Sequence, residues 1–267
     1  MNILLSLLLL NDGYLESGEG PARLGKSPTT VGMTSEDIRL TVGRNSVRTT
    51  CDFVFNNRGP ATTVRMGFPN SMDNMEEEDY AKPLKPILER FRTWVDGREV
   101  RAKLVRAAKD DPEWSYYVKP VSFAKNGRRR VRVTYSTGVG VLATDTRMGG
   151  GRYTLMGGYI LSSGKGWRGK IGTVSVAVTF LPSSGVKSPT KAYREIDDSG
   201  ATFNPQRAKI ARDPRTVWVS GPGNVRTHGR TVQFRVKDLE PEKTDNVFVK
   251  WGLVTDEQWE ARTKERR

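Results

Sequence analysis

The sequence predicts an all-β fold of two antiparallel sandwich-like domains, on the basis of three features. From Ile38 onward, apolar and polar residues alternate with a period of two, which is typical of strands that bury one face. The 267 residues include 27 glycines and 14 prolines, more turn chemistry than a helix bundle needs. Hydrophobic residues make up 36% of the chain, which is enough for a packed core and too much for a disordered chain.

The first clear strands are expected between residues 47 and 68. In Val47–Asn56 the apolar side chains and Cys51 share one face, so this lone cysteine is expected to be a small core residue. With one cysteine, no internal disulfide can form. Thr62–Phe68 alternates in the same way and is expected to pair antiparallel with the preceding strand. A short helical or irregular insertion is expected near 70–90, where an acidic stretch leads into a proline-containing one.

Two turn dipeptides predict hairpin-like units in the next part of the chain. Asp96-Gly97 lies between Phe91–Val95 and Arg98–Val105, and supplies the positive φ angles of a tight hairpin. Asn126-Gly127 follows two apolar segments, at 114–118 and 121–124. It leads into a strand over 128–135, in which valines and a tyrosine alternate with arginines.

A Gly- and Thr-rich segment after residue 136 suggests a domain boundary, giving an N-terminal domain over 11–136 and a C-terminal one over 137–254. Further strands are expected in the second half, at 153–161, 171–180, 216–220, 231–236 and 246–251. The charged tail, 255–267, is expected to form one short helix. Thr255 would be its N-cap, with Gln258 at the capping-box position.

The apolar run Ile3–Leu10 is too short to span a bilayer and has the length of a signal-peptide core. No basic residue precedes the run and no cleavage pattern follows it, so residues 1–10 are interpreted as the remnant of a longer signal peptide. The alternative is a buried strand. The first interpretation predicts export to the periplasm or the extracellular space, and the absence of a second apolar run argues against an integral membrane span.

The chain carries 44 lysines and arginines against 30 acidic residues, a formal net charge of +14, which favours anionic partners such as acidic glycans, envelope polymers or nucleic acid. The densest cationic group is the candidate anion-binding stripe Arg128, Arg129, Arg130 and Arg132. Arg130 and Arg132 are expected to point to solvent opposite the buried valines. The alternative reading is an edge strand that its charges protect from aggregation.

The aromatic residues near predicted strands could stack on sugars or bases, and Trp167, in a Gly-rich loop, is the candidate for that role. Strand aromatics are more often core residues. His228, at an expected hairpin tip, is the only histidine, and no metal-binding or cofactor-binding motif is present, so no cofactor is expected. The pairs Asp110-Asp111 and Asp197-Asp198 leave a carboxylate-dependent hydrolase as a third possibility.

Several motifs occur in an order that resembles a bacterial secreted family known as domain of unknown function 4424. They are Val31–Leu40, Val47–Asn57 with its Phe-Val-Phe-Asn-Asn ending, Thr63–Pro69, Val95–Gly97, Val131–Tyr135 and Gly166–Gly172. The resemblance extends over most of residues 11–251, with these motifs placed along it in order. The resemblance implies an exported β protein and brings no established catalytic residues. A more distant similarity connects the first half to vault-protein inter-alpha-trypsin domains, which are β-sandwich interaction modules.

These observations favour an exported, non-catalytic interaction or structural protein with an unidentified protein or cell-envelope partner. The chief alternative is a polyanion-binding protein, and a hydrolase comes third. The three hypotheses differ in the surface that they require. A docking protein needs an extended exposed face, a polyanion binder needs a continuous face of arginine and lysine, and a hydrolase needs two carboxylates facing one cleft.

Overall fold

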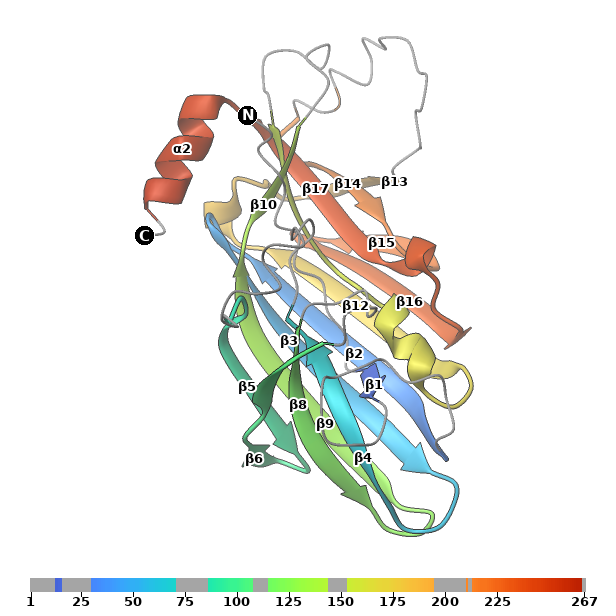
Figure 1. Cartoon of the computed structure of the whole chain (residues 1–267). Helices are drawn as coiled ribbons and strands as arrows, with labels where there is room; N and C mark the ends of the chain where they lie inside the picture. Colours follow the sequence, from blue (N-terminus) through green and yellow to red (C-terminus); the bar gives the residue numbers. More distant parts are fainter. Residues whose placement is uncertain are drawn as a thin grey trace.

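A computed structural model of the chain describes residues 13–15, 30–70, 86–107, 115–143, 153–194, 210 and 213–265. Within these ranges the protein is built almost entirely of β-strands, which form three sheets (Figure 1). The all-β prediction is therefore confirmed. The expected signal-peptide remnant, 1–10, and most of the expected insertion near 70–90 lie outside the described residues.

The largest sheet has eight strands. Their order is β15 (Asn224–His228), β16 (Thr231–Leu239), β12 (Ile171–Phe180), β2 (Val31–Val42), β3 (Ser46–Asn57), β9 (Arg128–Gly138), β5 (Glu89–Val95) and β6 (Arg98–Val100). All neighbouring strands in it are antiparallel except β2 and β12, which run parallel. The predicted boundary at 136/137 falls inside β9, and strands from both halves of the sequence are neighbours in this one sheet.

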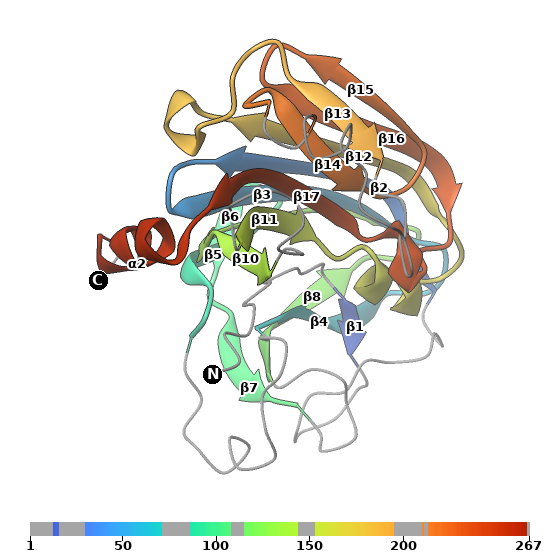
Figure 2. The same cartoon turned by 90° about the horizontal axis from the view of Figure 1, so that it is seen from above.

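Two smaller sheets complete the fold. The four-stranded sheet has the order β1 (Gly13–Leu15), β4 (Thr62–Pro69), β8 (Ser115–Phe123) and β7 (Lys103–Arg106). The five-stranded sheet has the order β10 (Gly140–Ala143), β11 (Tyr153–Tyr159), β17 (Val247–Val254), β14 (Thr216–Ser220) and β13 (Lys191–Arg194). Seen from above, β4 and β8 of one and β11 and β17 of the other lie on the same side of the eight-stranded sheet (Figure 2).

One buried core joins the layers. Valines and phenylalanines on the inner side of the eight-stranded sheet belong to a single apolar cluster together with residues from both smaller sheets. Phe55 of β3 packs on Trp167 with ring centroids 4.6 Å apart, and Phe180 of β12 meets Trp251 of β17 at 5.3 Å. Cys51 has no exposed surface, which confirms its predicted place in the core.

The prediction that the strands at 47–56 and 62–68 pair with each other is wrong. β3 pairs with β2 and β9, whereas β4 pairs with β1 and β8 in the other layer. The connection is fixed by Asn57, whose side-chain amide donates to the carbonyls of Pro60 and Ala124, at 2.6 and 3.0 Å. The chain therefore crosses between layers here, and alternation alone cannot distinguish such a crossing from a hairpin.

Other local predictions are confirmed. Asp96 and Gly97 have φ angles of 48° and 81° and connect β5 to β6 as an antiparallel hairpin. The second predicted hairpin-like unit, in contrast, is wrong. The segments at 114–118 and 121–124 form a single strand, β8, which runs through Pro120 and pairs with β4 and β7, whereas the following strand, β9, pairs with β3 and β5 in the other layer. α2 (Asp256–Lys264) begins with Thr255 as N-cap and a complete capping box with Gln258. The short 3-10 helices η3 (Ser162–Gly166), η4 (Pro182–Ser184) and η5 (Lys243–Asp245) lie in connections.

Candidate interaction surface

The face of the eight-stranded sheet that points away from the apolar core is here called the outer face. Along each central strand, buried residues alternate with half-buried or exposed polar ones, as in Ile38, Arg39 and Leu40 of β2. This pattern is typical of an antiparallel sheet with one face on the core and one face in water. The register of the strands therefore maps the outer face residue by residue.

Residues directly opposite each other on neighbouring strands lie about 5 Å apart, so they form rows across the sheet. One row contains Arg235, Ser175, Asp37, Asp52, Arg132, Trp94 and Glu99. The adjacent row contains Arg226, Gln233, Ala177, Arg39, Thr50, Thr134 and Arg92. In these two rows the middle carries small or paired polar groups, while most arginines lie toward both sides.

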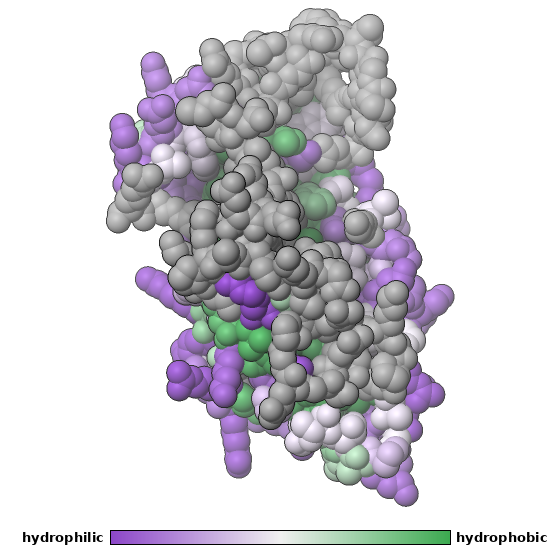
Figure 3. All heavy atoms as spheres, viewed as in Figure 1, coloured by the Kyte–Doolittle hydropathy of each residue, from purple (hydrophilic) through white to green (hydrophobic). Residues whose placement is uncertain are grey.

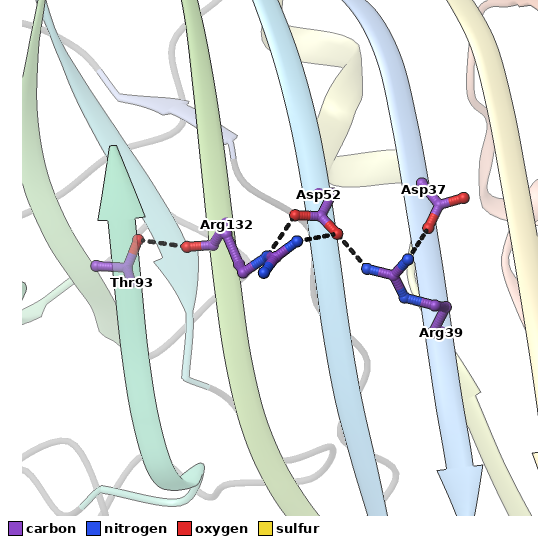
Figure 4. Close-up of polar contacts among 5 residues, drawn as sticks. All are labelled: Asp37, Arg39, Asp52, Thr93 and Arg132. Atoms are coloured by element: carbon purple, nitrogen blue, oxygen red, sulfur yellow. Dashed lines mark hydrogen bonds and ion pairs between the residues drawn. The ribbon is translucent and has the colours of Figure 1, made fainter. Parts of the chain in front are cut away.

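A chain of ion pairs crosses the central strands (Figure 4). Arg132 binds the carboxylate of Asp52 through Nε and Nη2, at 2.6 and 3.1 Å. The Oδ2 atom of Asp52 also accepts a hydrogen bond from Nη2 of Arg39. The Nη1 atom of Arg39 lies 3.1 Å from Oδ1 of Asp37. Asp37 and Asp52 are direct cross-strand neighbours, a destabilising arrangement for two like charges that the two guanidinium groups offset.

The hydrogen bonds to Asp52 raise the pKa of the Arg132 guanidinium, so this cation stays charged. Exposed pairs of this kind contribute up to about 1 kcal/mol each to stability, because water screens them. Their main consequence is geometric, since both guanidinium groups are held against the face. On the opposite side of the sheet, the hydroxyl of Thr93 donates to the backbone carbonyl of Arg132 at 3.0 Å, which ties β5 to β9 (Figure 4).

Arg128, Arg130 and Arg132 of the predicted cationic stripe lie at one end of this face, whereas Arg129 lies on the other side of β9, and the four arginines have different surroundings. Arg132 is bound by Asp52, and Arg129 binds Asp96 at 2.9 Å and the carbonyl of Ser122 at 2.7 Å. Arg128 and Arg130 are exposed and form no ion pair with the described residues. Arg130 and Arg132 share the outer face, as the alternation predicts. The stripe therefore contains two neutralised cations and two available ones.

The alternative that this strand is a protected edge is wrong. β9 lies between two strands, since β3 pairs with residues 128–138 and β5 with residues 131–136. Its charges consequently cannot serve to block pairing with another strand. They lie inside a broad surface, where cross-strand neighbours determine which of them are neutralised.

The sequence did not single out the cations on the other side of the face. Arg226 on β15, together with Arg235 and Lys237 on β16, is exposed on the same surface. Alternation with the buried Val232 and Phe234 predicts that Arg235 points to solvent. Only the strand order shows that Arg235 lies on the same outer face as the arginines of β9.

Trp94 is the only aromatic residue in the eight strands that lies on the outer face, the others being packed toward the core. The guanidinium of Arg92 lies 4.9 Å from the ring centroid. The same group binds Glu99 at 2.9 and 2.6 Å, and this hydrogen bonding lowers the pKa of the Glu99 carboxyl. Trp167, the predicted stacking residue, is instead 2% exposed and packs on Phe55, so its ring is part of the core.

Other candidate groups are less informative. Asp110-Asp111 and Asp197-Asp198 lie outside the described residues. His228 is exposed at the end of β15, next to the hairpin turn that the sequence predicts. Among the described residues, no three histidine, cysteine or acidic side chains gather as a metal site would require. The same residues include no helix with the length and apolar character of a membrane span.

Hydrophobic side chains are concentrated on part of the molecular surface. Figure 3 shows hydrophobic residues gathered in the lower half of one face, with hydrophilic side chains projecting at its borders. The rows of the outer face consist entirely of described residues, and they supply the candidate site.

The chain matches no family model and no curated protein. Among solved structures it is similar to a "putative nutrient binding protein" from Legionella pneumophila, with a TM-score of 0.59 and 19% identity, over 90% of this chain and 72% of that one. A zinc metallopeptidase from Deinococcus radiodurans gives a TM-score of 0.38 at 11% identity, over 83% and 42% of the two chains. The likeness to the Legionella protein shows a shared fold.

Proposed function

We propose that this protein is a non-catalytic interaction module that works outside the cytoplasm and binds an anionic partner on its outer face. The observation that carries this proposal is the charge of that face. Among the described residues it presents nine cations against four carboxylates, namely Arg39, Arg48, Arg92, Arg128, Arg130, Arg132, Arg226, Arg235 and Lys237 against Asp37, Asp52, Glu89 and Glu99. Such an excess attracts polyanions and accelerates their encounter.

The non-catalytic part of the proposal follows from how the acidic groups of the face are used. Asp37, Asp52 and Glu99 each bind a guanidinium group in the plane of the sheet. A glycosidase instead needs one carboxyl group free to protonate the leaving group and a second one across the substrate. The paired carboxylates of the outer face are suited to accept hydrogen bonds.

Retention on two chemically different anionic matrices, heparin and phosphocellulose, tests the docking surface. In the face variant, Arg48, Arg130 and Arg235 are replaced by serine. In the control variant, Arg101, Lys103 and Lys187, which are exposed elsewhere, are replaced by serine with the same loss of charge. The face variant should elute at distinctly lower salt than the control on both matrices, because fewer counterions are released on binding. Equal elution of the two variants would overturn the proposal.

The predicted signal peptide supports the extracytoplasmic location, and a separate experiment tests it. Expression from the next upstream in-frame start, followed by sequencing of the mature N-terminus, should reveal a chain cleaved shortly after Leu10. Recovery of the unprocessed chain in the cytoplasm would refute the location without affecting the docking surface.

A further inference from the structure

The cations of the outer face form two flanks. One flank consists of Arg226, Arg235 and Lys237 on β15 and β16, and the other of Arg92, Arg128, Arg130 and Arg132 on β5 and β9. The order β16-β12-β2-β3-β9 places four strand spacings between the two flanks. At about 4.8 Å for each spacing, the flanks are about 19 Å apart. A ligand that contacts both flanks must therefore be extended and carry several anionic groups.

Between the flanks lies a floor of small side chains, most of which carry hydroxyl groups. It consists of Ser35, Thr41, Thr50, Thr173, Ser175, Ala177 and Thr179, with Thr134 of β9 at its border, and the exposed Arg48 of β3 lies among them. A hydroxyl group both donates and accepts hydrogen bonds. The floor also contains the carboxylates of Asp37 and Asp52, which are held by Arg39 and Arg132 and can accept from a ligand. A ligand that lies here needs many hydroxyl groups of its own.

Protein and nucleic-acid partners fit this surface less well. The centre of a protein interface is apolar and aromatic, whereas the apolar side chains of the described outer face are limited to Val54, Ala177 and Trp94. Single-stranded nucleic acid needs several aromatic platforms, and the face has one. Duplex DNA is read by an element that enters a groove, which the interior strands of a wide sheet cannot do.

We propose that the anionic partner is an acidic glycan, a polysaccharide with carboxylate or sulfate groups, lying across the strands from one flank to the other. This inference rests on the proposed function and names the chemistry of its partner. The acidic groups of the glycan pair with the two flanks, and Arg130 is the available guanidinium nearest to Trp94. Sugar hydroxyl groups bind the floor, and Trp94 offers an aromatic surface for a sugar ring at the end of the site.

Calorimetric titration of the full chain with defined polymers tests this chemistry. The ligands are polygalacturonate oligomers, heparin oligomers, methyl-esterified polygalacturonate as the uncharged match, polyphosphate and single-stranded DNA. The two acidic glycans should bind saturably. The esterified polymer should bind at least tenfold more weakly, because it cannot pair with the flanks.

A pair of variants separates recognition of a glycan from general attraction of anions. Thr50→Val with Thr134→Val removes two adjacent floor hydroxyl groups without changing the charge. Affinity for the acidic glycans should fall about tenfold, the usual effect of losing two hydrogen bonds, while polyphosphate affinity stays the same. The control is Thr63→Val with Ser122→Ala, a hydroxyl pair 2.8 Å apart on the four-stranded sheet, which should bind like the wild type.

The possible outcomes distinguish the two proposals. If the floor variant binds all polymers like the wild type, or if polyphosphate or DNA binds as tightly as the glycans, the glycan inference is wrong and the cationic docking face stands. Failure of both acidic glycans to bind the wild type also overturns the inference. If the variant that lacks Arg48, Arg130 and Arg235 retains full binding to every polymer, both proposals fall.

Discussion

The contact between Tyr159 and Glu36 connects the two layers of the protein through the core. Tyr159, on β11 of the five-stranded sheet, donates its hydroxyl to Oε1 of Glu36, on β2 of the eight-stranded sheet, at 3.0 Å. Tyr159 has no exposed surface, and Glu36 is 1% exposed. A polar contact this deeply buried is sensitive to the loss of either group, because no water replaces it. Tyr159→Phe should therefore destabilise the protein.

The size of the effect follows from what the substitution removes. Phenylalanine preserves the ring and its packing, so the cavity contribution is small and the loss is that of a donor to a buried carboxyl group. Such a loss costs about 1–3 kcal/mol. For a protein of this size, the melting temperature should fall by about 2–4 °C for each kcal/mol.

Urea unfolding, monitored by far-UV circular dichroism, measures the effect as a lower midpoint at an unchanged slope. Tyr193→Phe, at a half-buried position on β13, is the matched control and should change stability by less than about 0.5 kcal/mol. If the two variants unfold at the same urea concentration, the hydroxyl of Tyr159 does not stabilise the fold and the reasoning is refuted.

Two further predictions concern titration and charge. Burial raises the pKa of both Tyr135 and Tyr159 well above the usual value, so the unfolded chain loses these protons first, and stability should fall above about pH 10 by about 1.4 kcal/mol per pH unit for each tyrosine. Tyr135→Phe should reduce that slope by one such increment in urea unfolding at pH 10–11, and an unchanged slope would contradict the assignment. Asp52→Asn should cost no more than about 1 kcal/mol, because the pairs are exposed, yet should delay elution from heparin, because Arg132 loses its ion pair and Arg39 keeps only the one with Asp37. Elution at the wild-type salt concentration would show that these arginines do not contact the matrix.

Local features of this fold were predictable because short-range chemistry determines them. The Asp96-Gly97 hairpin and the Thr255 cap each depend on the conformational preferences of a few neighbouring residues. The burial of Cys51 follows from a period-two pattern that one strand displays by itself. No distant part of the chain is needed to infer these features.

The arrangement of strands was not predictable in the same way. β3 and β4 have the alternation of a hairpin, yet Asn57 directs the chain into the other layer. The parallel pairing of β2 with β12 joins segments more than 100 residues apart, and nothing in either segment specifies its partner. Trp167 illustrates the same limit, since a loop position in the sequence gave no indication that the ring would pack on Phe55.

The candidate site has some features that local sequence predicts and others that depend on the arrangement of strands. Alternation places Arg130 and Arg132 on a solvent-facing surface, but their different availability depends on Asp52, which lies 80 positions before Arg132 in the chain. Sequence patterns can therefore predict the direction of a charge, whereas the strand order determines whether that charge is already neutralised. The same order places Lys237 opposite Arg130 and Arg235 opposite Arg132, across the floor. Because available cations occur on both flanks and hydroxyl groups lie between them, attraction and recognition can be assigned to different residues and changed independently.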